Sequence, residues 1–195
     1  MKVFDSGMPD EAYWNSLLDV PLIVDWLNPG IVSAPIVEIG CGYGTFTIPV
    51  AREAKVDIYA FDIDPSMIET ARSNARRAGV RNIVFSCRDV TEEGTELHSG
   101  IAGMVLLFNI LHFSQRRIML EEASRILKPG GVAAIIHWRK DIPTPRGPSV
   151  DTRPDEQMIL DSIEGLDFDG NSRILEPYHW GIQLIKSNKK SEEAK

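Results

Sequence analysis

Ile36-Val37-Glu38-Ile39-Gly40-Cys41-Gly42-Tyr43-Gly44 is the stretch that decides the fold expected for this chain. A short apolar, β-branched run gives way to three glycines at alternate positions, and residues 45–51 continue with a spacing that suits a helix. The turn between strand and helix needs glycines because a Cβ forbids its backbone angles and blocks the close approach of a ligand. The helix start would aim unpaired N–H groups at the same place. The stretch therefore predicts a strand, a tight turn and a helix, with either a ligand site or a packing turn between them.

A second acidic position lies at a suitable distance from this turn. Residues 57–61 form another strand-like run that ends at Asp62, which follows Gly40 by 22 residues. That distance is close to the ~20 residues expected for the acid that binds a ribose hydroxyl in a nucleotide-binding βαβ unit. The alternative is that Asp62 only ends a strand. Asp64 before Pro65 is typical of a helix start, so Asp64 is assigned to capping and Asp62 is left for a ligand.

Further motifs follow in a fixed order along the chain: Arg88-Asp89, Asn109-Ile110-Leu111-His112 and Leu127-Lys128-Pro129-Gly130-Gly131. Together with Glu38-x-Gly40-x-Gly42-x-Gly44 and Asp62, this pattern resembles the class I S-adenosylmethionine-dependent methyltransferases over residues 36–138. One departure is Gly103, where that family often has Asp near the start of its fourth strand. The resemblance implies an α/β fold with a Rossmann-like, doubly wound, mostly parallel seven-stranded sheet that ends in an antiparallel hairpin.

The resemblance also implies a site for S-adenosylmethionine, with S-adenosylhomocysteine as the product. Asp89 would accept the adenine amino group, and Ile63 and Met67 would pack near the adenine or ribose. Asn109 is a candidate because it follows an apolar strand, although Asp89 could instead only cap a helix before Thr91. The expected cofactor site comprises Glu38, Gly40, Cys41, Gly42, Gly44, Asp62, Ile63, Met67, Asp89 and Asn109.

The expected activity is transfer of the methyl group to a small-molecule acceptor. Transfer from a sulfonium is an in-line displacement on an activated donor, so the protein must chiefly hold the reactants in line and exclude water. This explains why the sequence has no Ser/His/Asp, paired-carboxylate or metal motif. An acidic thiol or a metalloid acceptor needs no base, whereas an alcohol or amine needs one. The candidates for that base are His112, His137, Asp141 and Tyr178, and a lone His after an apolar run is more often structural.

Composition limits the partners. A chain of 195 residues with 43% hydrophobic and 25% charged residues suits one globular domain. A net charge of −7 argues against a nucleic-acid partner, because affinity for phosphate backbones depends on clustered Lys and Arg. The alternatives are an RNA or protein methyltransferase and a catalytically silent S-adenosylmethionine-binding protein. A nicotinamide-dependent oxidoreductase fits less well because its third glycine would fall at Thr45.

Cys41 and Cys87 have no metal-ligand spacing, and we expect both to be reduced thiols. The sequence has no apolar run of the ~20 residues that span a bilayer and no signal-peptide charge pattern. We therefore expect a cytoplasmic monomer or homodimer that contacts no membrane.

The acceptor pocket is expected to use three segments: the N-terminal segment, the strand-end residues 109–113 and the loop 137–154. Tyr13 and Trp14 belong to an apolar helical stripe before Pro21, which is either a helix packed on the sheet edge or a lid over the site. The proline-rich loop 139–154 carries Arg139, Lys140, Arg146 and Arg153 against Asp141 and Asp151. This local positive charge predicts an anionic acceptor, although the charges could simply be solvated. Tyr13, Trp14, His112 and Arg146 are the expected substrate-binding residues, with Arg146 as the anchor.

The remaining elements follow from periodicity and breakers. We expect one domain over residues 1–186, with a helical cap at 1–30, the substrate loop at 139–154 and a disordered tail at 187–195. We also expect a flexible segment at 1–8. A helix over 65–78 would bury Met67, Ala71, Ala75 and Ala78, and a helix capped by Ser114 would bury Met119, Ala123 and Ile126. Strands are expected at 83–87, 104–108, 132–137, 173–176 and 179–186, and a helix at 155–163.

Overall fold

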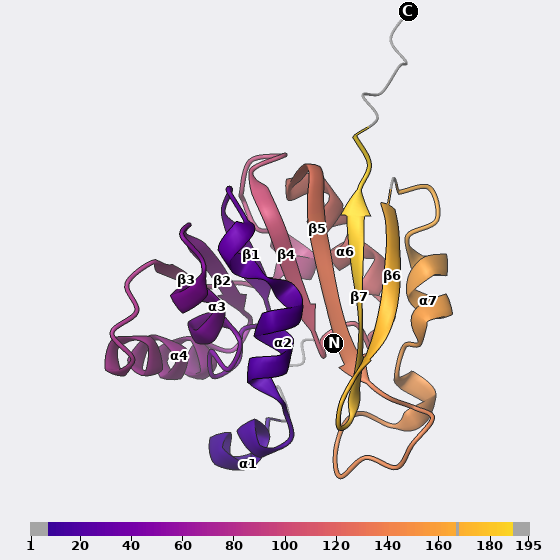
Figure 1. The fold of residues 1–195 in the computed structure, drawn as a ribbon, viewed down its shortest axis with the longest axis horizontal. Helices are drawn as coiled ribbons and strands as arrows, with labels where there is room; N and C mark the ends of the chain where they lie inside the picture. Colours follow the sequence, from indigo (N-terminus) through magenta and orange to yellow (C-terminus); the bar gives the residue numbers. More distant parts are fainter. Residues whose placement is uncertain (1–7, 167, 189–195) are drawn as a thin grey trace, which may run out of the picture.

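The structure is a computed structural model that describes residues 8–166 and 168–188. Its centre is a seven-stranded sheet with the strand order β3-β2-β1-β4-β5-β7-β6 (Figure 1). Strands β1 to β5 pair in parallel, and β7 pairs antiparallel with both β5 and β6. This topology confirms the expected fold class. The strands are β1 Ile36–Ile39, β2 Ile58–Asp62, β3 Ile83–Cys87, β4 Ala102–Phe108, β5 Leu127–Trp138, β6 Phe168–Leu175 and β7 His179–Lys186.

Helices cover both faces of the sheet. On one face, α2 (Val20–Leu27), α3 (Thr47–Glu53) and α4 (Pro65–Arg77) pack against β1, β2 and β4. On the other face lie α5 (Val90–Glu93), α6 (Arg116–Ile126) and α7 (Glu156–Ser162). All seven residues of β4 are buried, as expected for a parallel strand with helices on both sides. Two 3₁₀ turns, Pro29–Ile31 and Val150–Thr152, complete the regular structure.

Aspartates cap most of these helices, and the sequence predicts this role for Asp64. Asp10 begins α1 (Glu11–Ser16), and Asp64 caps α4 with Pro65 in the first turn. The prediction that Ser114 caps α6 is wrong. The helix begins at Arg116 after Gln115, without a side-chain cap, because the Ser114 hydroxyl instead donates to the Gln115 side chain.

The buried faces of α4 and α6 differ by one residue from the expected ones. In α4 the inward positions are Ile68, Ala71 and Ala75, while Met67 and Ala78 are half-buried. In α6 Leu120 takes the place expected for Met119, with Ala123 and Ile126 buried as expected. Adjacent apolar residues in the sequence leave the helix phase ambiguous, and packing against the sheet selects the second residue of each pair.

Two strands begin five residues earlier than expected. β5 starts at Leu127, where it pairs with Ala102, and the register then shifts so that Met104 pairs with Val132. Residues 128–131 form the irregularity at this shift, and their polar, glycine-containing composition conceals the strand. β6 starts at Phe168 rather than Arg173. Most of its side chains are exposed, so β6 shows no hydrophobic alternation, and pairing with β7 is what defines it.

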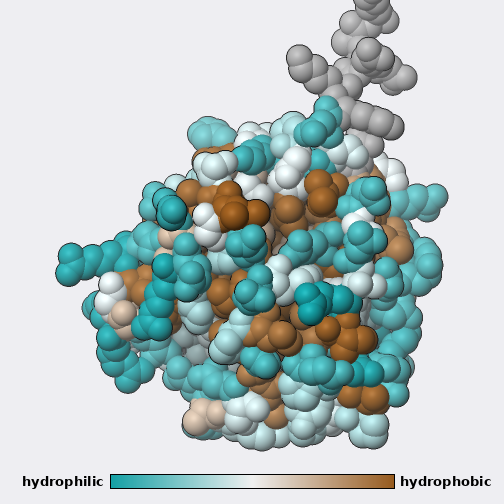
Figure 2. All heavy atoms as spheres, in the orientation of Figure 1, coloured by the Kyte–Doolittle hydropathy of each residue, from teal (hydrophilic) through white to brown (hydrophobic). Residues whose placement is uncertain are grey.

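Helix α2 packs on a face of the sheet and not on its edge, and α1 packs against Trp138 at the end of β5. Figure 1 shows α2 in front of the middle strands, with α1 below it. The two helices are separated at residues 17–19, and Pro21 lies in the first turn of α2. On this side of the molecule hydrophobic side chains occur in several groups divided by hydrophilic ones (Figure 2). Most of the expected flexible segment 1–8 and most of the expected tail 187–195 lie outside the described residues.

Within residues 8–166 and 168–188, no helix has the length and apolar character needed to cross a membrane.

Candidate functional site

A cavity of about 690 Å³ lies at the carboxyl ends of the parallel strands. Its wall includes Gly40, Cys41 and Gly42 after β1, Asp62 and Ile63 after β2, Asp89 after β3, and Asn109 after β4. Trp14, His112 and Arg146 also line it. Ligands of open α/β sheets bind at this edge because the strand ends and helix N-termini converge there. The fold therefore brings together seven of the ten expected cofactor-site residues and three of the four expected substrate-binding residues.

The glycine turn has the backbone geometry that the sequence predicts. Gly40, Gly42 and Gly44 have φ angles of 80°, 51° and 80°, which disfavour residues with a Cβ. A Cβ on Gly40 would lie 2.6 Å from the Cγ2 atom of Ile110. Gly44 does not line the main cavity, and it packs against Ile48 and Ala71. The first two glycines therefore shape the cavity, and the third joins the turn to the helices behind it.

Asp62 holds the turn while facing the cavity. Its Oδ2 accepts the Gly42 N–H at 2.8 Å, and its Oδ1 accepts the Asp64 N–H at 2.9 Å. The side chain is buried, and burial raises the pKa of its carboxyl group. A carboxylate has about four lone-pair sites, so two backbone donors leave each oxygen able to accept another hydrogen bond.

Glu38 lies beneath the turn rather than in the cavity wall. It is 1% exposed and accepts a hydrogen bond from the Thr47 hydroxyl. Burial raises the pKa of Glu38 to about 8, so its carboxyl group is largely protonated at neutral pH. The geometry gives Glu38 a structural position, in contrast to the direct cofactor contact expected from the sequence.

The two cysteines are free thiols. Burial raises the pKa of Cys41 well above its usual value, which makes this cavity-lining thiol unreactive.

Asp89 caps a helix and also lines the cavity. It caps α5 by accepting the Thr91 N–H at 3.1 Å and the Thr91 hydroxyl at 2.6 Å, both through Oδ1. It also lines the cavity, where Oδ2 remains available for another donor. Neighbouring Arg88 forms ion pairs with Glu93 and Glu96. Met67 does not reach the cavity, because the turn of α4 that carries it places Ile68 toward the sheet.

The four candidate bases occupy different environments. His112 lines the cavity, whereas His137 is completely buried and is not part of the wall. Asp141 is mostly exposed and pairs with Arg139 at 2.8 Å. Tyr178 packs near Trp138, with 6.4 Å between ring centroids. Neither Asp141 nor Tyr178 lines the cavity.

Asn109 has the left-handed backbone conformation, with φ at 59°. Its Nδ2 lies 3.4 Å from Nε2 of His179, and its buried Oδ1 has no hydrogen-bond partner among the described residues. An amide with an unpaired buried acceptor at a cavity wall is suited to receive a ligand donor.

The loop 139–154 is built around one buried cation. Arg153 is 6% exposed, and its guanidinium donates to three loop carbonyls. The acceptors are Arg139 at 2.7 Å, Pro148 at 2.9 Å and Arg146 at 3.4 Å. Because an Arg has five donors in a fixed fork, one side chain can fix several carbonyls at once.

The loop charges are therefore not equivalent. Arg139 pairs with Asp141 and Glu176, and Lys140 pairs with Asp155. Of the four cations expected to attract an anion, only Arg146 lines the cavity. It is followed by Gly147 (φ 119°), where an added Cβ would lie 2.9 Å from the Trp138 ring. This close approach holds the loop against Trp138.

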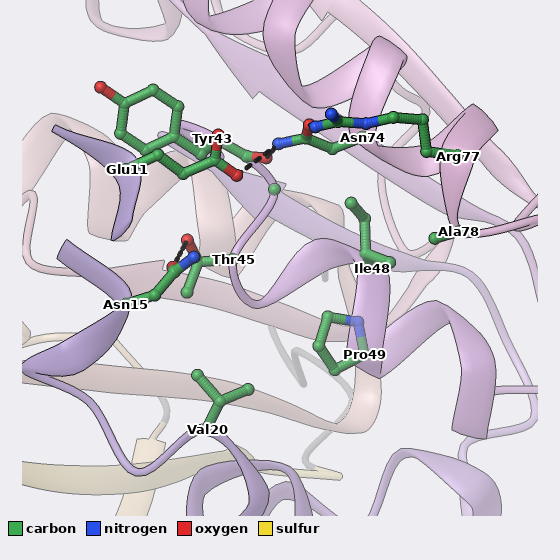
Figure 3. A pocket seen from close by; sticks show the side chains of 11 residues that line it. Glu11, Asn15, Val20, Tyr43, Thr45, Ile48, Pro49, Asn74, Arg77 and Ala78 are labelled. Carbon is green, nitrogen blue, oxygen red and sulfur yellow. Dashed lines mark hydrogen bonds between the residues drawn. The ribbon is translucent and has the colours of Figure 1, made fainter. Parts of the chain in front are cut away.

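Helix α1 is joined to the glycine turn by polar contacts around a second, open cavity of about 460 Å³ (Figure 3). Glu11 accepts from Asn74 at 2.7 Å, and the Thr45 hydroxyl donates to Asn15 at 2.9 Å. The Tyr43 hydroxyl donates to the Pro9 carbonyl at 2.7 Å. These contacts fix α1 beside the turn.

The two expected aromatic residues of α1 diverge. Trp14 is buried, lines the main cavity and packs edge-on against Trp138, with 6.2 Å between ring centroids. Tyr13 is 43% exposed and does not line the cavity. Consecutive residues of a helix point about 100° apart, so a one-turn helix can present only one of them to the site.

Several wall residues were missed by the sequence reasoning. They are mostly apolar and resemble core residues in the sequence, although a strand end alone would have indicated Phe108. The missed aromatic wall residues are Phe46, Phe61 and Phe108, whereas Phe113 and Trp138 lie in the segments expected to form the acceptor pocket.

Comparison with known proteins matches residues 36–131, just under half of the chain, to a methyltransferase domain family. Among curated proteins, the chain is 33% identical over 81 residues to a 23S rRNA (uracil(1939)-C(5))-methyltransferase of Marinomonas sp.. That match covers 40% of this chain and 18% of the relative. A ribosomal protein L11 methyltransferase of Dechloromonas aromatica is 28% identical over 142 residues, covering 65% of this chain and 44% of the relative. The chain thus spans less than half of the length of either relative.

Among solved structures, the fold is similar to that of a SAM dependent methyltransferase from Aquifex aeolicus, with a TM-score of 0.76. Sequence identity is 20%, and the match covers 90% of this chain and 93% of the other.

Proposed function

The chain belongs to the class I S-adenosylmethionine-dependent methyltransferases, and on that basis we propose that it transfers a methyl group from S-adenosylmethionine to a small-molecule acceptor. The observation that carries the proposal is the convergence of Gly40, Gly42, Asp62 and Asp89 on one cavity at the carboxyl ends of β1 to β3. When bound, S-adenosylmethionine supplies a methyl group that its sulfonium already activates. The protein then has to bind, orient and exclude water.

The donor set fits the proposed cofactor. Gly40 and Gly42 let the backbone form the cavity wall, and Asp62 has free lone pairs for ribose hydroxyls. Asp89 offers Oδ2 to an amino group, and Ile63 contributes apolar surface to the same wall. Of the other expected residues, Asn109 offers Oδ1 as an acceptor, whereas Glu38, Gly44 and Met67 do not line the cavity.

The acceptor region is proposed to lie between Trp14, Trp138 and Arg146. Aromatic rings supply apolar surface there, and Arg146 supplies a cation that suits an anionic group on the acceptor. A small molecule agrees with a chain of net charge −7, and the described residues form one domain around a single sheet. We therefore propose a single methyltransferase domain, with 139–154 as its substrate loop.

A macromolecular acceptor is the second candidate, because the two curated relatives are named for ribosomal RNA and for a ribosomal protein. Transfer from radiolabelled S-adenosylmethionine to pooled metabolites, RNA and protein would separate these acceptors. Labelled RNA or protein with no labelled metabolite would reject the small-molecule proposal. Binding without any transfer would instead support a silent S-adenosylmethionine-binding protein.

The cofactor is tested by calorimetry with S-adenosylhomocysteine. Asp62→Asn should weaken binding by roughly 1–3 kcal/mol, because the neutral amide cannot form the charged hydrogen bonds that the carboxylate makes to the ligand. Asp64→Asn is the matched control, since this neighbouring acid caps α4 and does not line the cavity. Equal affinities of the two variants, or tighter binding of NAD than of S-adenosylhomocysteine by the wild type, would contradict the assignment.

A further inference from the structure

Two histidine rings meet at the inner side of the cavity wall. His112 follows β4 and lines the cavity, and His137 is completely buried near the end of β5. Their ring centroids lie 5.6 Å apart in an edge-to-face arrangement with an interplanar angle of 69°. Among the described residues, His112 Nδ1 and His137 Nε2 are buried without a hydrogen-bond partner. Histidines that serve only packing seldom leave ring nitrogens in this state.

The protonation of His137 follows from its backbone contact. The Trp138 N–H donates to His137 Nδ1 at 3.0 Å, so Nδ1 keeps its lone pair. Burial lowers the pKa of His137 well below its usual value, and the neutral ring therefore carries its proton on Nε2. A ring that is buried, neutral and outside the cavity wall cannot accept a proton from a substrate.

His112 differs in its access to the cavity. Its Nδ1 is buried and the residue lines the cavity, so we assign Nε2 as the nitrogen that faces a substrate. Burial lowers the pKa of His112, and the nearby Arg116 cation acts in the same direction. His137 from β5 faces the same ring. The other charged groups of the wall are Asp62, Arg88, Asp89, Glu92 and Arg146.

On the basis of the proposed function, we propose that His112 is the general base of the methyl transfer and that His137 positions the His112 ring. The acceptor then reacts through a weakly acidic hydroxyl group. In this step His112 Nε2 takes the hydroxyl proton while the acceptor oxygen bonds to the methyl carbon. The carbon–sulfur bond breaks, and its electron pair goes to sulfur, giving the neutral thioether. The His112 proton then passes to solvent.

The acceptor class follows from when a base is needed. A thiol with a pKa near ~8.5 is already a few per cent ionised at neutral pH, whereas a phenol near ~10 is ionised about tenfold to a hundredfold less. A neutral imidazole at the cavity wall is therefore useful for the phenol and of little use for the thiol. The aromatic surfaces of Trp14, Phe113 and Trp138 and the Arg146 cation favour an aromatic hydroxyl compound that also carries an anionic group.

The test uses paired probes that differ only in the reacting atom. A set of carboxylated phenols, including 4-hydroxybenzoate, and the thiol analogue of each would be incubated with labelled S-adenosylmethionine across pH. With a phenol, the wild-type rate should rise through an apparent pKa below that of free histidine and then level off. His112→Gln should lower the phenol rate by about 100-fold or more and remove this rise, while any thiol rate changes less than threefold.

His98→Gln is the control because His98 is an exposed histidine away from the cavity. His137→Phe, which keeps a ring, should retain most of the activity, whereas His137→Ala should lower kcat about tenfold with little change in KM. Methyl transfer to thiols alone, or a His112→Gln variant as active as His98→Gln, would overturn the inference. So would the failure of every phenol with wild-type protein that still binds S-adenosylhomocysteine. Absent binding of S-adenosylhomocysteine would instead count against the proposed function.

Discussion

The glycine turn at 40–44 and the loop at 139–154 contribute to the wall of one cavity, but they are held in different ways. The turn follows directly from a buried strand, and Asp62 at the end of the adjacent strand accepts its Gly42 N–H. The loop has little regular structure, and the Arg153 guanidinium holds it through three carbonyls. Backbone geometry thus determines the wall of the cavity proposed to bind the cofactor. One buried side chain holds the wall proposed to bind the acceptor.

The largest expected effect concerns the carboxyl group beneath the turn. The folded-state pKa of Glu38 is raised to about 8 from an ordinary value of 4.5. The protonated Glu38 side chain therefore contributes fully to stability at pH values below its pKa in the unfolded chain. This contribution is lost as the pH rises through the folded-state pKa of about 8. Glu38→Gln removes this titration. The difference in unfolding free energy between wild type and Glu38→Gln should change by roughly 3–5 kcal/mol between about pH 5 and pH 9.

Urea unfolding of both proteins across this range measures the difference. Taking the difference cancels the opposite effect of His179, whose folded-state pKa is lowered to about 3 by burial. A difference that stays constant with pH would show that Glu38 is ionised in the folded protein, and the turn would then not rest on a neutral carboxyl group.

The next effect concerns the turn itself. Gly42→Val should weaken S-adenosylhomocysteine binding by at least about 100-fold, because a β-branched residue disfavours a φ of 51° and its side chain would occupy the cavity. Gly79→Val is the control, since Gly79 has a φ of 71° and an added Cβ there meets nothing within 4 Å. Calorimetry on both folded variants would separate backbone strain from loss of the site. Equal affinities would mean that the turn does not contact the ligand.

A smaller effect is expected in the loop. Arg153→Lys should destabilise the loop locally by roughly 1–3 kcal/mol, because an ammonium cannot reach the three carbonyls that the guanidinium fork joins. Hydrogen exchange of residues 139–154 should become faster, while S-adenosylhomocysteine affinity stays within threefold. Arg173→Lys, on the exposed face of β6, is the matched control. If Arg153→Lys weakened cofactor binding as much as Gly42→Val does, the loop would also support the cofactor side of the cavity.

The smallest effect is expected where α1 meets the turn. The contacts of Asn15 with Thr45 and of Pro9 with Tyr43 connect α1 to residues beside Gly42 and Gly44. Binding of S-adenosylhomocysteine should therefore slow hydrogen exchange of residues 11–17 by about tenfold, with α7 amides as the unaffected control. If the α1 amides are equally protected without ligand, then α1 is a fixed part of the wall and not a lid.

Sequence alone predicted the sheet, because its strands and glycine turn obey local rules. It failed at Phe168 to Ser172, where an exposed edge strand shows no alternation, and at Leu127, where a register shift hides the start of β5. Both features depend on pairing with a distant strand, which periodicity cannot show.

The cofactor side of the site was also largely predictable, because strand ends meet at one edge of a parallel sheet. The acceptor side was not. Charge counting treated Arg146 and Arg153 alike, yet one lines the cavity and the other is buried among carbonyls. Likewise Tyr13 and Trp14 are neighbours in the sequence, and only the helix phase decides which one reaches the site.

Helix α2 packs on β7: the Trp26 ring lies 2.8 Å from where a Cβ on Gly181 would stand, and Gln183 donates to the Trp26 carbonyl at 2.9 Å. These partners are 157 residues apart, so α2 leaves the ribosome long before its docking surface exists. We expect α2 to remain undocked during synthesis and to be among the last elements to gain protection from hydrogen exchange in refolding. Pulse-labelled hydrogen exchange that showed α2 protected before β7 would reverse this order.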